Sequence, residues 1–415
     1  MGVLKAIGKA VLALVAILAI ALLGVYLTNP TYYGRFAGVL FVNPVRDVDF
    51  YSPLEVVKGG AGAPIPRAPE NARTISAEGW QKALNYAKQM DSFALVVWQG
   101  GQIQYEYYKP GFNPTDRTDP ASMGKSVMVL VLGLAIADGR IRSVDEPAAT
   151  YISEWQNDAR SKITIRNLLN MASGLQREKF SPSPMSEGMK LNLGTDLAET
   201  ILKIPAGEEP GKTFAYYNAN SQLLGLIIER ATGKRYADYL SEKLWSRIGA
   251  RDGRVFLDHE GGLARTFCCL QATAEDWIRV GLLHLNLGKV GEEEIVPHEW
   301  MTMVRTPSLT NPNYGLQTWL GTTYEEKRSY GKGVPSYVPH SEPFAAPDVI
   351  YFDGAGGQRV YIITSKQMVI VRTGSGAIDF KTGAFKWDDA IIPNALIRGL
   401  GAPGAPPIPS PDSKE

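Results

Sequence analysis

"ASMGKSVMVLVLGLAIADGR", residues 121–140, is the stretch from which the fold prediction starts. Pro120 is tolerated just before a helix, and the unbroken apolar run that follows predicts a buried helix over 122–138. Ser122 and Lys125 are three residues apart, so they share one face of that helix. A serine hydroxyl becomes a good nucleophile when a lysine with a lowered pKa takes its proton. The stretch therefore opens either with a reactive serine or with the polar first turn of an ordinary core helix.

The same Ser-x-x-Lys pattern occurs again at Ser329-Tyr330-Gly331-Lys332. Gly331, Gly333 and Pro335 argue against a helix there, so we predict a loop without a fixed serine-to-lysine geometry. Such tetrads are also expected by chance in a chain of this length. Taken alone, the tetrad at Ser122 therefore favours the ordinary helix start.

Tyr216-Tyr217-Asn218 precedes an apolar helix that we predict over 219–231. A phenol close to a lysine can share its proton, acting as a base and later as an acid. The Asn218 amide can hold Lys125 or a substrate carbonyl. By itself a Tyr-x-Asn triplet is more often a packed aromatic residue followed by a helix cap. Downstream of Ser-x-x-Lys it becomes a stronger catalytic signal.

Several stretches in order along the chain resemble one enzyme superfamily. "DPASMGKSV", "ITIRNLLNMASGL", "FAYYNANSQLLGLIIERATG" and "NYGLQTWLG", within about residues 80–400, are similar to landmarks of the serine β-lactamase and penicillin-binding-protein superfamily. The closest similarity is to the branch with class C β-lactamases, D-alanyl carboxypeptidases, family VIII esterases and 6-aminohexanoate-dimer hydrolases. The resemblance implies that Ser122 is the acylated nucleophile, Lys125 its partner and Tyr216 the general base and acid. It implies a supporting polar role for Asn218.

The third motif of this superfamily is usually Lys- or His-Thr-Gly on a strand beside the site. A literal Lys381-Thr382-Gly383 exists, but only about 30 residues follow it, too few for a further strand and a helix, so we interpret it as a turn. Gly354-Ala355-Gly356-Gly357 is followed by two strands and a helix and is predicted to occupy the place of the motif.

This departure changes the expected substrate. Gly354, Ala355 and Gly356 offer no cation or hydroxyl for a substrate carboxylate, unless Arg359 or Arg177 substitutes for it. A backbone N–H near Ala355 can still complete an oxyanion hole with that of Ser122.

The fold class follows from the order of the predicted elements. The sequence predicts first a helix, then a hairpin that turns at Gly100-Gly101, and then a mainly helical pattern over 120–300. Three predicted strands follow, "DVIYFDG", "RVYIITS" and "MVIVRTG", and then a last helix over 387–400. We predict an α/β (α+β) protein in which both ends of the chain build one antiparallel sheet and a helical region is inserted. The resemblance implies a β-lactamase/transpeptidase-like fold.

The amino terminus predicts membrane targeting. Lys5 and Lys9 precede about 18 apolar or small residues, which favours an uncleaved anchor at 1–27 over a cleaved signal peptide. The lysines predict that the rest of the chain lies on the far side of the membrane, the periplasm in a Gram-negative source. We expect a linker at 28–80, the hydrolase domain at 81–402 and a disordered Pro-rich tail at 403–415.

Composition and residue spacing limit the kinds of partner and cofactor that we expect. With 43 basic and 42 acidic residues the net charge is +1, so a nucleic-acid partner is not expected. The four histidines show no metal-ligand spacing, and no metal or organic cofactor is expected. Adjacent cysteines rarely have the geometry for a disulfide, so Cys268 and Cys269 are interpreted as buried small apolar residues.

These observations predict a membrane-anchored serine hydrolase acting on a small-molecule amide or ester. A β-lactamase or D-alanyl-D-alanine carboxypeptidase of cell-wall metabolism is the alternative within enzymes. A non-catalytic receptor for cell-wall fragments is the alternative from another class, because folds of this type can keep a cleft without turnover.

Overall fold

A six-stranded antiparallel sheet forms the framework in the computed structural model, which describes residues 2–39, 41–43, 45–178, 181–376, 379 and 382–401. Its strands lie in the order β3 (Gln102–Tyr108), β2 (Ser92–Gln99), β13 (Met368–Gly374), β12 (Gln358–Ile363), β11 (Val349–Gly354) and β8 (Trp319–Leu320). β2, from the first part of the chain, pairs with β13, from the last part. The predicted sheet built from both ends of the chain is therefore confirmed.

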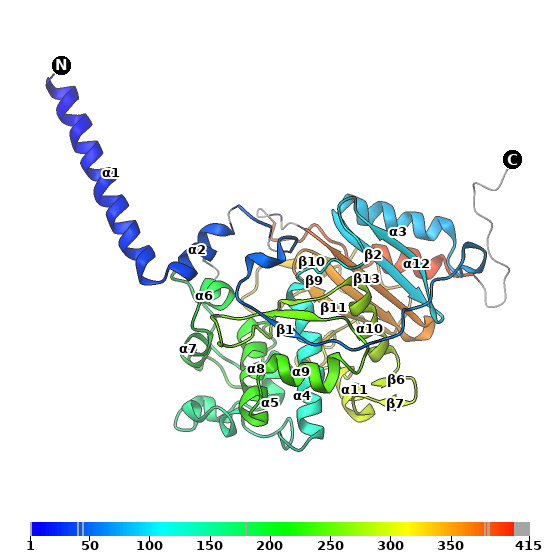
Figure 1. The fold of residues 1–415 in the computed structure, drawn as a ribbon. Coiled ribbons are helices and arrows are strands. Elements are labelled where there is room, and N and C mark those ends of the chain that lie inside the picture. The colour runs from blue at the N-terminus through cyan, green and yellow to red at the C-terminus, as the bar shows by residue number, and fades with distance from the viewer. Residues whose placement is uncertain are drawn as a thin grey trace.

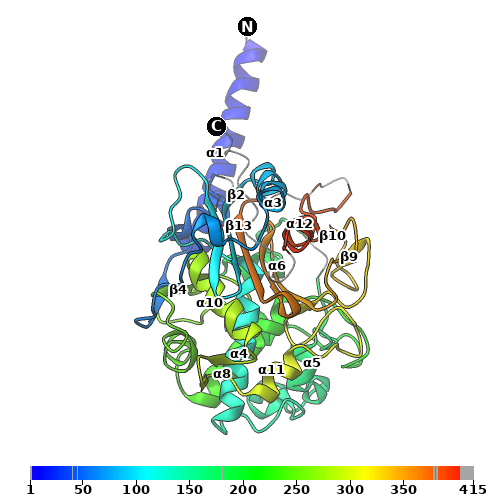
Figure 2. The ribbon, with the colours of Figure 1, turned by 90° about the vertical axis from the view of Figure 1, so that its right-hand side faces the viewer.

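Helices cover both faces of this sheet (Figures 1 and 2). α3 (Ala77–Gln89) and α12 (Ile391–Arg398) pack together on one face, and α10 (Ala274–Leu285) packs against β12 and β13 on the other. Successive side chains of a strand point to opposite faces, and in β2 both sets are buried. This explains why these strands are continuous apolar runs without polar alternation.

The inserted helical region has α4 (Gly124–Ala137) near its centre (Figure 1). Gly124 to Ala135 are all buried, and a helix that is apolar on every side belongs inside the core. α8 (Asn218–Thr232) packs directly against α4. The other helices here are α5 (Ile165–Leu169), α6 (Glu187–Leu193), α7 (Leu197–Leu202), α9 (Tyr236–Leu240) and α11 (His298–Val304). The predicted helical middle is confirmed, with α6 as an additional short helix.

The amino-terminal part divides into a projecting helix and a packed segment. α1 (Gly2–Thr28) extends away from the body in Figure 1, and its stretch Leu4–Thr28 is long and apolar enough to cross a membrane or to serve as a signal sequence. α2 (Pro30–Gly38) follows immediately, and its buried Arg35 donates to carbonyl oxygens in the body, including those of Leu193 and Asp258.

The stretch expected to be a linker also contributes a strand. β1 (Leu54–Val57) pairs with β4 (Gly253–Phe256), which pairs with β5 (Leu270–Gln271). Two small hairpins complete the described strands: β6 (Lys289–Val290) with β7 (Glu293–Glu294), and β9 (Lys327–Ser329) with β10 (Tyr337–Pro339). The predicted tail at 403–415 lies outside the described residues.

Candidate active site

Ser122 lies in a single turn of 3-10 helix, Ala121–Met123, that leads into α4. The Asp119 carboxylate accepts the Ala121 N–H at 2.8 Å and thereby fixes the entry to this turn. Burial raises the pKa of Asp119 to about 6, although the N–H groups of Ala121 and Cys269 oppose the shift. Ser122 is therefore presented at a fixed helix start, where the positive end of the helix dipole favours a negative charge.

Lys125, one turn further, is buried with 1% of its surface exposed. Its Nζ lies 2.8 Å from Ser122 Oγ, 2.9 Å from Asn218 Oδ1 and 2.8 Å from the carbonyl oxygen of Phe267. Burial lowers the pKa of Lys125 well below its ordinary value, and the negative charge of Asp353 only partly opposes this. Three uncharged acceptors thus hold an amine that gives up its proton readily.

Tyr216 approaches the same group from the segment that precedes α8. Lys125 Nζ lies 4.9 Å from the centre of the Tyr216 ring, and the phenol forms a hydrogen bond with Ser122. Burial and the charge of Asp353 raise the pKa of Tyr216, so the phenol keeps its proton. Its ring packs in an aromatic cluster with Tyr314, Trp319 and Tyr330. The structure therefore brings Ser122, Lys125, Tyr216 and Asn218 into one site.

A buried ionic cluster lies behind the Tyr216 ring. Asp353 bonds to Arg328 and Arg359, and Asp389 bonds to the same two arginines. All four side chains are less than 5% exposed, and their two positive and two negative charges balance. Buried charges are tolerated when they are paired in this way. Arg359, expected as one candidate for holding a substrate carboxylate, is committed to this cluster, and that expectation is wrong.

The turn from Gly354 to Gly357 connects β11 and β12 beside Ser122. A Cβ on Gly354 would lie 2.2 Å from the carbonyl oxygen of Pro120, so only glycine lets β11 approach the nucleophile turn this closely. Ser122, Asn218, Ala355 and Gly356 all line one cavity of about 530 Å³. The predicted third segment thus borders the same space as the nucleophile.

The other candidates for this third segment lie elsewhere. Thr382 and Gly383 follow Asp379 in a turn whose N–H groups bond to the Asp379 carbonyl, whereas Lys381 lies outside the described residues. Arg177, the loop arginine, donates to the carbonyl oxygen of Tyr216 at 2.8 Å and is exposed. It remains free to meet solvent, although it is not among the described residues that line the cavity.

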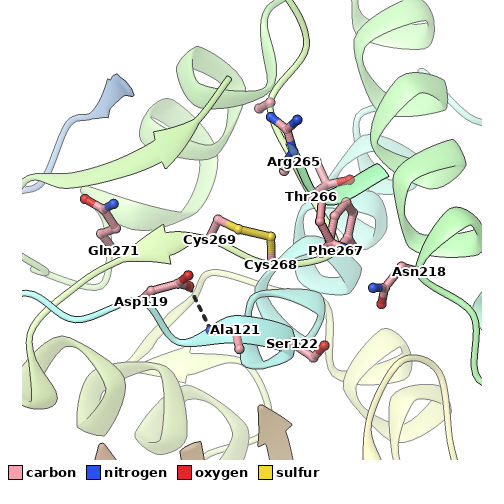
Figure 3. Close-up of a disulfide and its surroundings, with 12 residues drawn as sticks. Asp119, Ala121, Ser122, Asn218, Arg265, Thr266, Phe267, Cys268, Cys269 and Gln271 are labelled. Atoms are coloured by element: carbon pink, nitrogen blue, oxygen red, sulfur yellow. Dashed lines mark hydrogen bonds between the residues drawn. A yellow bond between two sulfur atoms is a disulfide. The ribbon is translucent and has the colours of Figure 1, made fainter. Parts of the chain in front are cut away.

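The two cysteines correct another expectation. Cys268 and Cys269 form a disulfide between adjacent residues (Figure 3), whereas the sequence interpretation made them unpaired. Both line the cavity with Ser122, and the N–H of Cys269 bonds to the Asp119 carboxylate. The bridge is held between the Ser122 turn and Phe267, whose carbonyl accepts from Lys125. Adjacency in sequence was therefore a poor guide to the state of these thiols.

Two parts of the site have no signature in the sequence. The Phe267 acceptor is a backbone carbonyl, and Asp353 acts from a strand end together with arginines on other segments. Neither the Phe267 carbonyl nor the role of Asp353 could be predicted from charged residues that are close together in the sequence. Among the described residues, no group of three or more His, Cys, Asp or Glu side chains is placed to hold a metal ion.

Comparison with known proteins agrees with this architecture. 6-Aminohexanoate-dimer hydrolase of Paenarthrobacter ureafaciens is 30% identical over 223 residues, which are 51% of this chain and 56% of that protein. The chain thus spans about half the length of this relative.

Two solved structures have the same fold. A Bacillus anthracis protein assigned as a 6-aminohexanoate-dimer hydrolase aligns with a TM-score of 0.66 and 22% identity over 80% of this chain and 87% of its own. A family VIII carboxylesterase aligns with a TM-score of 0.60 and 16% identity over 83% and 100%. The β-lactamase family model matches residues 74–384, which is most of the sequence, and the chain therefore belongs to the β-lactamase family.

Proposed function

We propose that this chain is a serine hydrolase that cleaves an ester or amide of a small molecule through an acyl-enzyme on Ser122. The observation that carries the proposal is the buried Lys125 amine, 2.8 Å from Ser122 Oγ. A lysine among uncharged acceptors is easily deprotonated, and a deprotonated amine is the base that a serine hydroxyl requires.

The hydrogen bonds of Lys125 suggest how the first proton moves. A neutral amine has two N–H groups and one lone pair. When Asn218 Oδ1 and the Phe267 carbonyl accept the two N–H groups, the lone pair is left facing Ser122 Oγ. Lys125 then takes the Ser122 proton while the bond from Oγ to the substrate carbonyl carbon forms.

Tyr216 is the proposed proton donor to the leaving group. Its raised pKa keeps it a phenol, so it has a proton to give as the bond from carbonyl carbon to leaving group breaks. Lys125 returns its proton to Tyr216, and water releases the acyl group by the same transfers in reverse. The N–H groups of Ser122 and Ala355 are the proposed oxyanion hole.

A fluorophosphonate probe tests the nucleophile. We expect labelling of the wild-type chain on Ser122 and none of Ser122→Ala, with Ser329→Ala labelled like the wild type. Equal labelling of Ser122→Ala, or none of the wild type, would refute the proposal. If the wild-type chain is not labelled and also turns over no substrate, the non-catalytic receptor is favoured.

The substrate class is tested with nitrocefin beside short-chain p-nitrophenyl esters. The uncharged Gly354–Gly357 turn favours an ester or a linear amide over a β-lactam or a D-Ala-D-Ala peptide. Rapid nitrocefin hydrolysis with inert esters would reverse that ranking.

We also propose that α1 anchors the chain in the inner membrane and leaves the hydrolase domain in the periplasm. Protease added to sealed spheroplasts should digest the domain. Protection until the membrane is broken would contradict this orientation.

A further inference from the structure

Part of the chain between α2 and β1 lies beside Ser122. Val42, Asn43, Val45 and Tyr51 line the same cavity of about 530 Å³ as the nucleophile. These residues precede 74–384, the range that the family model matches. One wall of this cavity is therefore supplied by residues that precede the range of the family model.

Contacts with the domain hold this wall in place. The Val45 carbonyl accepts the N–H of Asp119, three residues before Ser122, at 3.2 Å. The Val48 carbonyl accepts from Gln271 Nε2 at 2.6 Å, and the Tyr51 ring packs on Phe256 with centroids 4.6 Å apart. The segment is thus tied to the nucleophile turn itself and to the sheet of β1, β4 and β5.

Further hydrogen bonds hold the residues beside the wall. Asp49 accepts from Arg254 Nη1 at 2.9 Å, and the Ser52 carbonyl accepts from Arg35 Nη2 at 2.5 Å. Because Arg35 also bonds to carbonyls near α6, α2 and the wall share one buried anchor. A wall fixed at several points keeps its shape when substrate binds, which is what selectivity requires.

The described cavity lining carries a negative charge and no positive one. Among the described residues that line it, Asp119 is the only charged side chain, and the others are apolar, amide, hydroxyl or backbone groups. Val42, Val45 and Phe267 provide apolar surface. A carboxylate would meet no cation among these lining residues and would be repelled by Asp119, whereas an uncharged acyl chain would gain by leaving water.

We propose that residues 42–43 and 45–51 form a specificity wall that selects substrates with an uncharged, partly apolar acyl chain and rejects those whose chain ends in a carboxylate. The inference rests on the proposed acyl transfer at Ser122 and names the substrate class of that site. Val42 and Val45 are the specificity-determining residues, because a cation at either position would supply the charge that the lining lacks.

Two p-nitrophenyl esters of equal chain length test the wall: the hexanoate, and the adipate monoester with its terminal carboxylate. We expect the wild-type chain to prefer hexanoate by at least about tenfold in kcat/KM. Val45→Lys should raise kcat/KM for the adipate monoester about tenfold, since a unit charge at close range in a partly buried cavity has an effect of this order. Val42→Lys should act in the same direction and serves as the second variant if Val45→Lys does not fold.

The matched control is Val290→Lys, an exposed valine in β6 outside the cavity. It should keep the wild-type preference, which shows that added net charge alone does not change selectivity. If both wall variants hydrolyse hexanoate but keep the wild-type preference, the wall is refuted while the proposed function stands. If the probe fails to label Ser122 and neither ester is hydrolysed, the proposed function fails and the inference fails with it.

Discussion

The two Ser-x-x-Lys tetrads differ in the surroundings of their lysines. Lys125 is buried among three uncharged oxygen acceptors, whereas the Lys332 side chain is 62% exposed and forms an ion pair with Glu208. Burial lowers the pKa of Lys125 and so makes its amine a base for Ser122, whereas the Lys332 amine lies at the surface against Glu208. The Ser-x-x-Lys motif therefore indicates a reactive pair only where the fold buries the lysine amine away from water.

The second tetrad contributes to the site in another way. The Tyr330 carbonyl accepts the N–H of Tyr216 at 2.9 Å, and the Phe214 carbonyl accepts the N–H of Lys332 at 3.1 Å. The Tyr330 ring packs against the Tyr216 ring. The segment predicted to be a loop instead begins with the end of β9, and its hydrogen bonds hold the chain that positions the proposed proton donor.

Replacing each lysine by an apolar chain of similar length gives the largest contrast. We expect Lys125→Met to lower kcat for a p-nitrophenyl ester by about 10³-fold or more, because loss of an activating base from a serine nucleophile has effects of this size. Lys332→Met should change kcat less than twofold. Steady-state kinetics on both variants, with circular dichroism to verify folding, measure the difference.

The comparison fails if the two variants lose activity equally. Ester hydrolysis by Lys125→Met at the wild-type rate would likewise show that burial of this amine serves the core alone. Rescue of Lys125→Met by added primary amines would support the base directly.

Removal of the Tyr216 hydroxyl should have the next largest effect. Tyr216→Phe keeps the ring in its aromatic cluster but removes the proton donor, so we expect kcat to fall about 10²-fold. The pH profile separates the two roles. Activity should rise with pH as Lys125 loses its proton, and because its pKa is lowered this rise should end well below the ordinary lysine value of about 10.4.

Tyr216→Phe should retain this rising limb, since the limb belongs to Lys125. A limb that disappears in Tyr216→Phe would instead identify the tyrosine as the base. The assay should use an ester without ionisable groups, so that only the enzyme titrates.

The sequence predicted those parts of the molecule that depend on local patterns. α4 was predictable because its apolar run is long and unbroken, and the hairpin of β2 and β3 because Gly100-Gly101 takes positive φ angles that glycine tolerates. The proximity of Ser122 and Tyr216 followed from the family resemblance, because nothing local joins them.

The remaining parts depend on contacts between distant segments. The Phe267 carbonyl is a backbone group that any residue would supply. β1 is only four residues long, too short for a periodic signal. The wall at 42–43 and 45–51 is placed by hydrogen bonds to Asp119 and Gln271. Arg359 shows the reverse error, since its charge suggested a ligand site but is neutralised inside the core.

The supporting role of the second tetrad gives a smaller prediction, on stability. The Tyr330 hydroxyl donates to buried Asp353 at 2.6 Å. Tyr330→Phe keeps the ring but leaves this carboxylate one donor short, which should lower the free energy of unfolding by about 1–3 kcal/mol. Urea denaturation measures this value, and kcat should change far less than in Tyr216→Phe. An unchanged free energy of unfolding would show that the two arginines satisfy Asp353 without the phenol.

The smallest effect is expected at the serine of the second tetrad. Ser329 is exposed, and its Oγ accepts a local hydrogen bond from the N–H of Gly331 at 2.9 Å. Ser329→Ala should therefore change the free energy of unfolding by less than about 1 kcal/mol and leave kcat unchanged. The double variant Ser122→Ala/Ser329→Ala sharpens the contrast. If the residual turnover of Ser122→Ala does not arise at Ser329, the double variant should retain it. Loss of that residual turnover in the double variant would mean that the exposed serine reacts despite its solvated lysine, and that burial is not what separates the two tetrads.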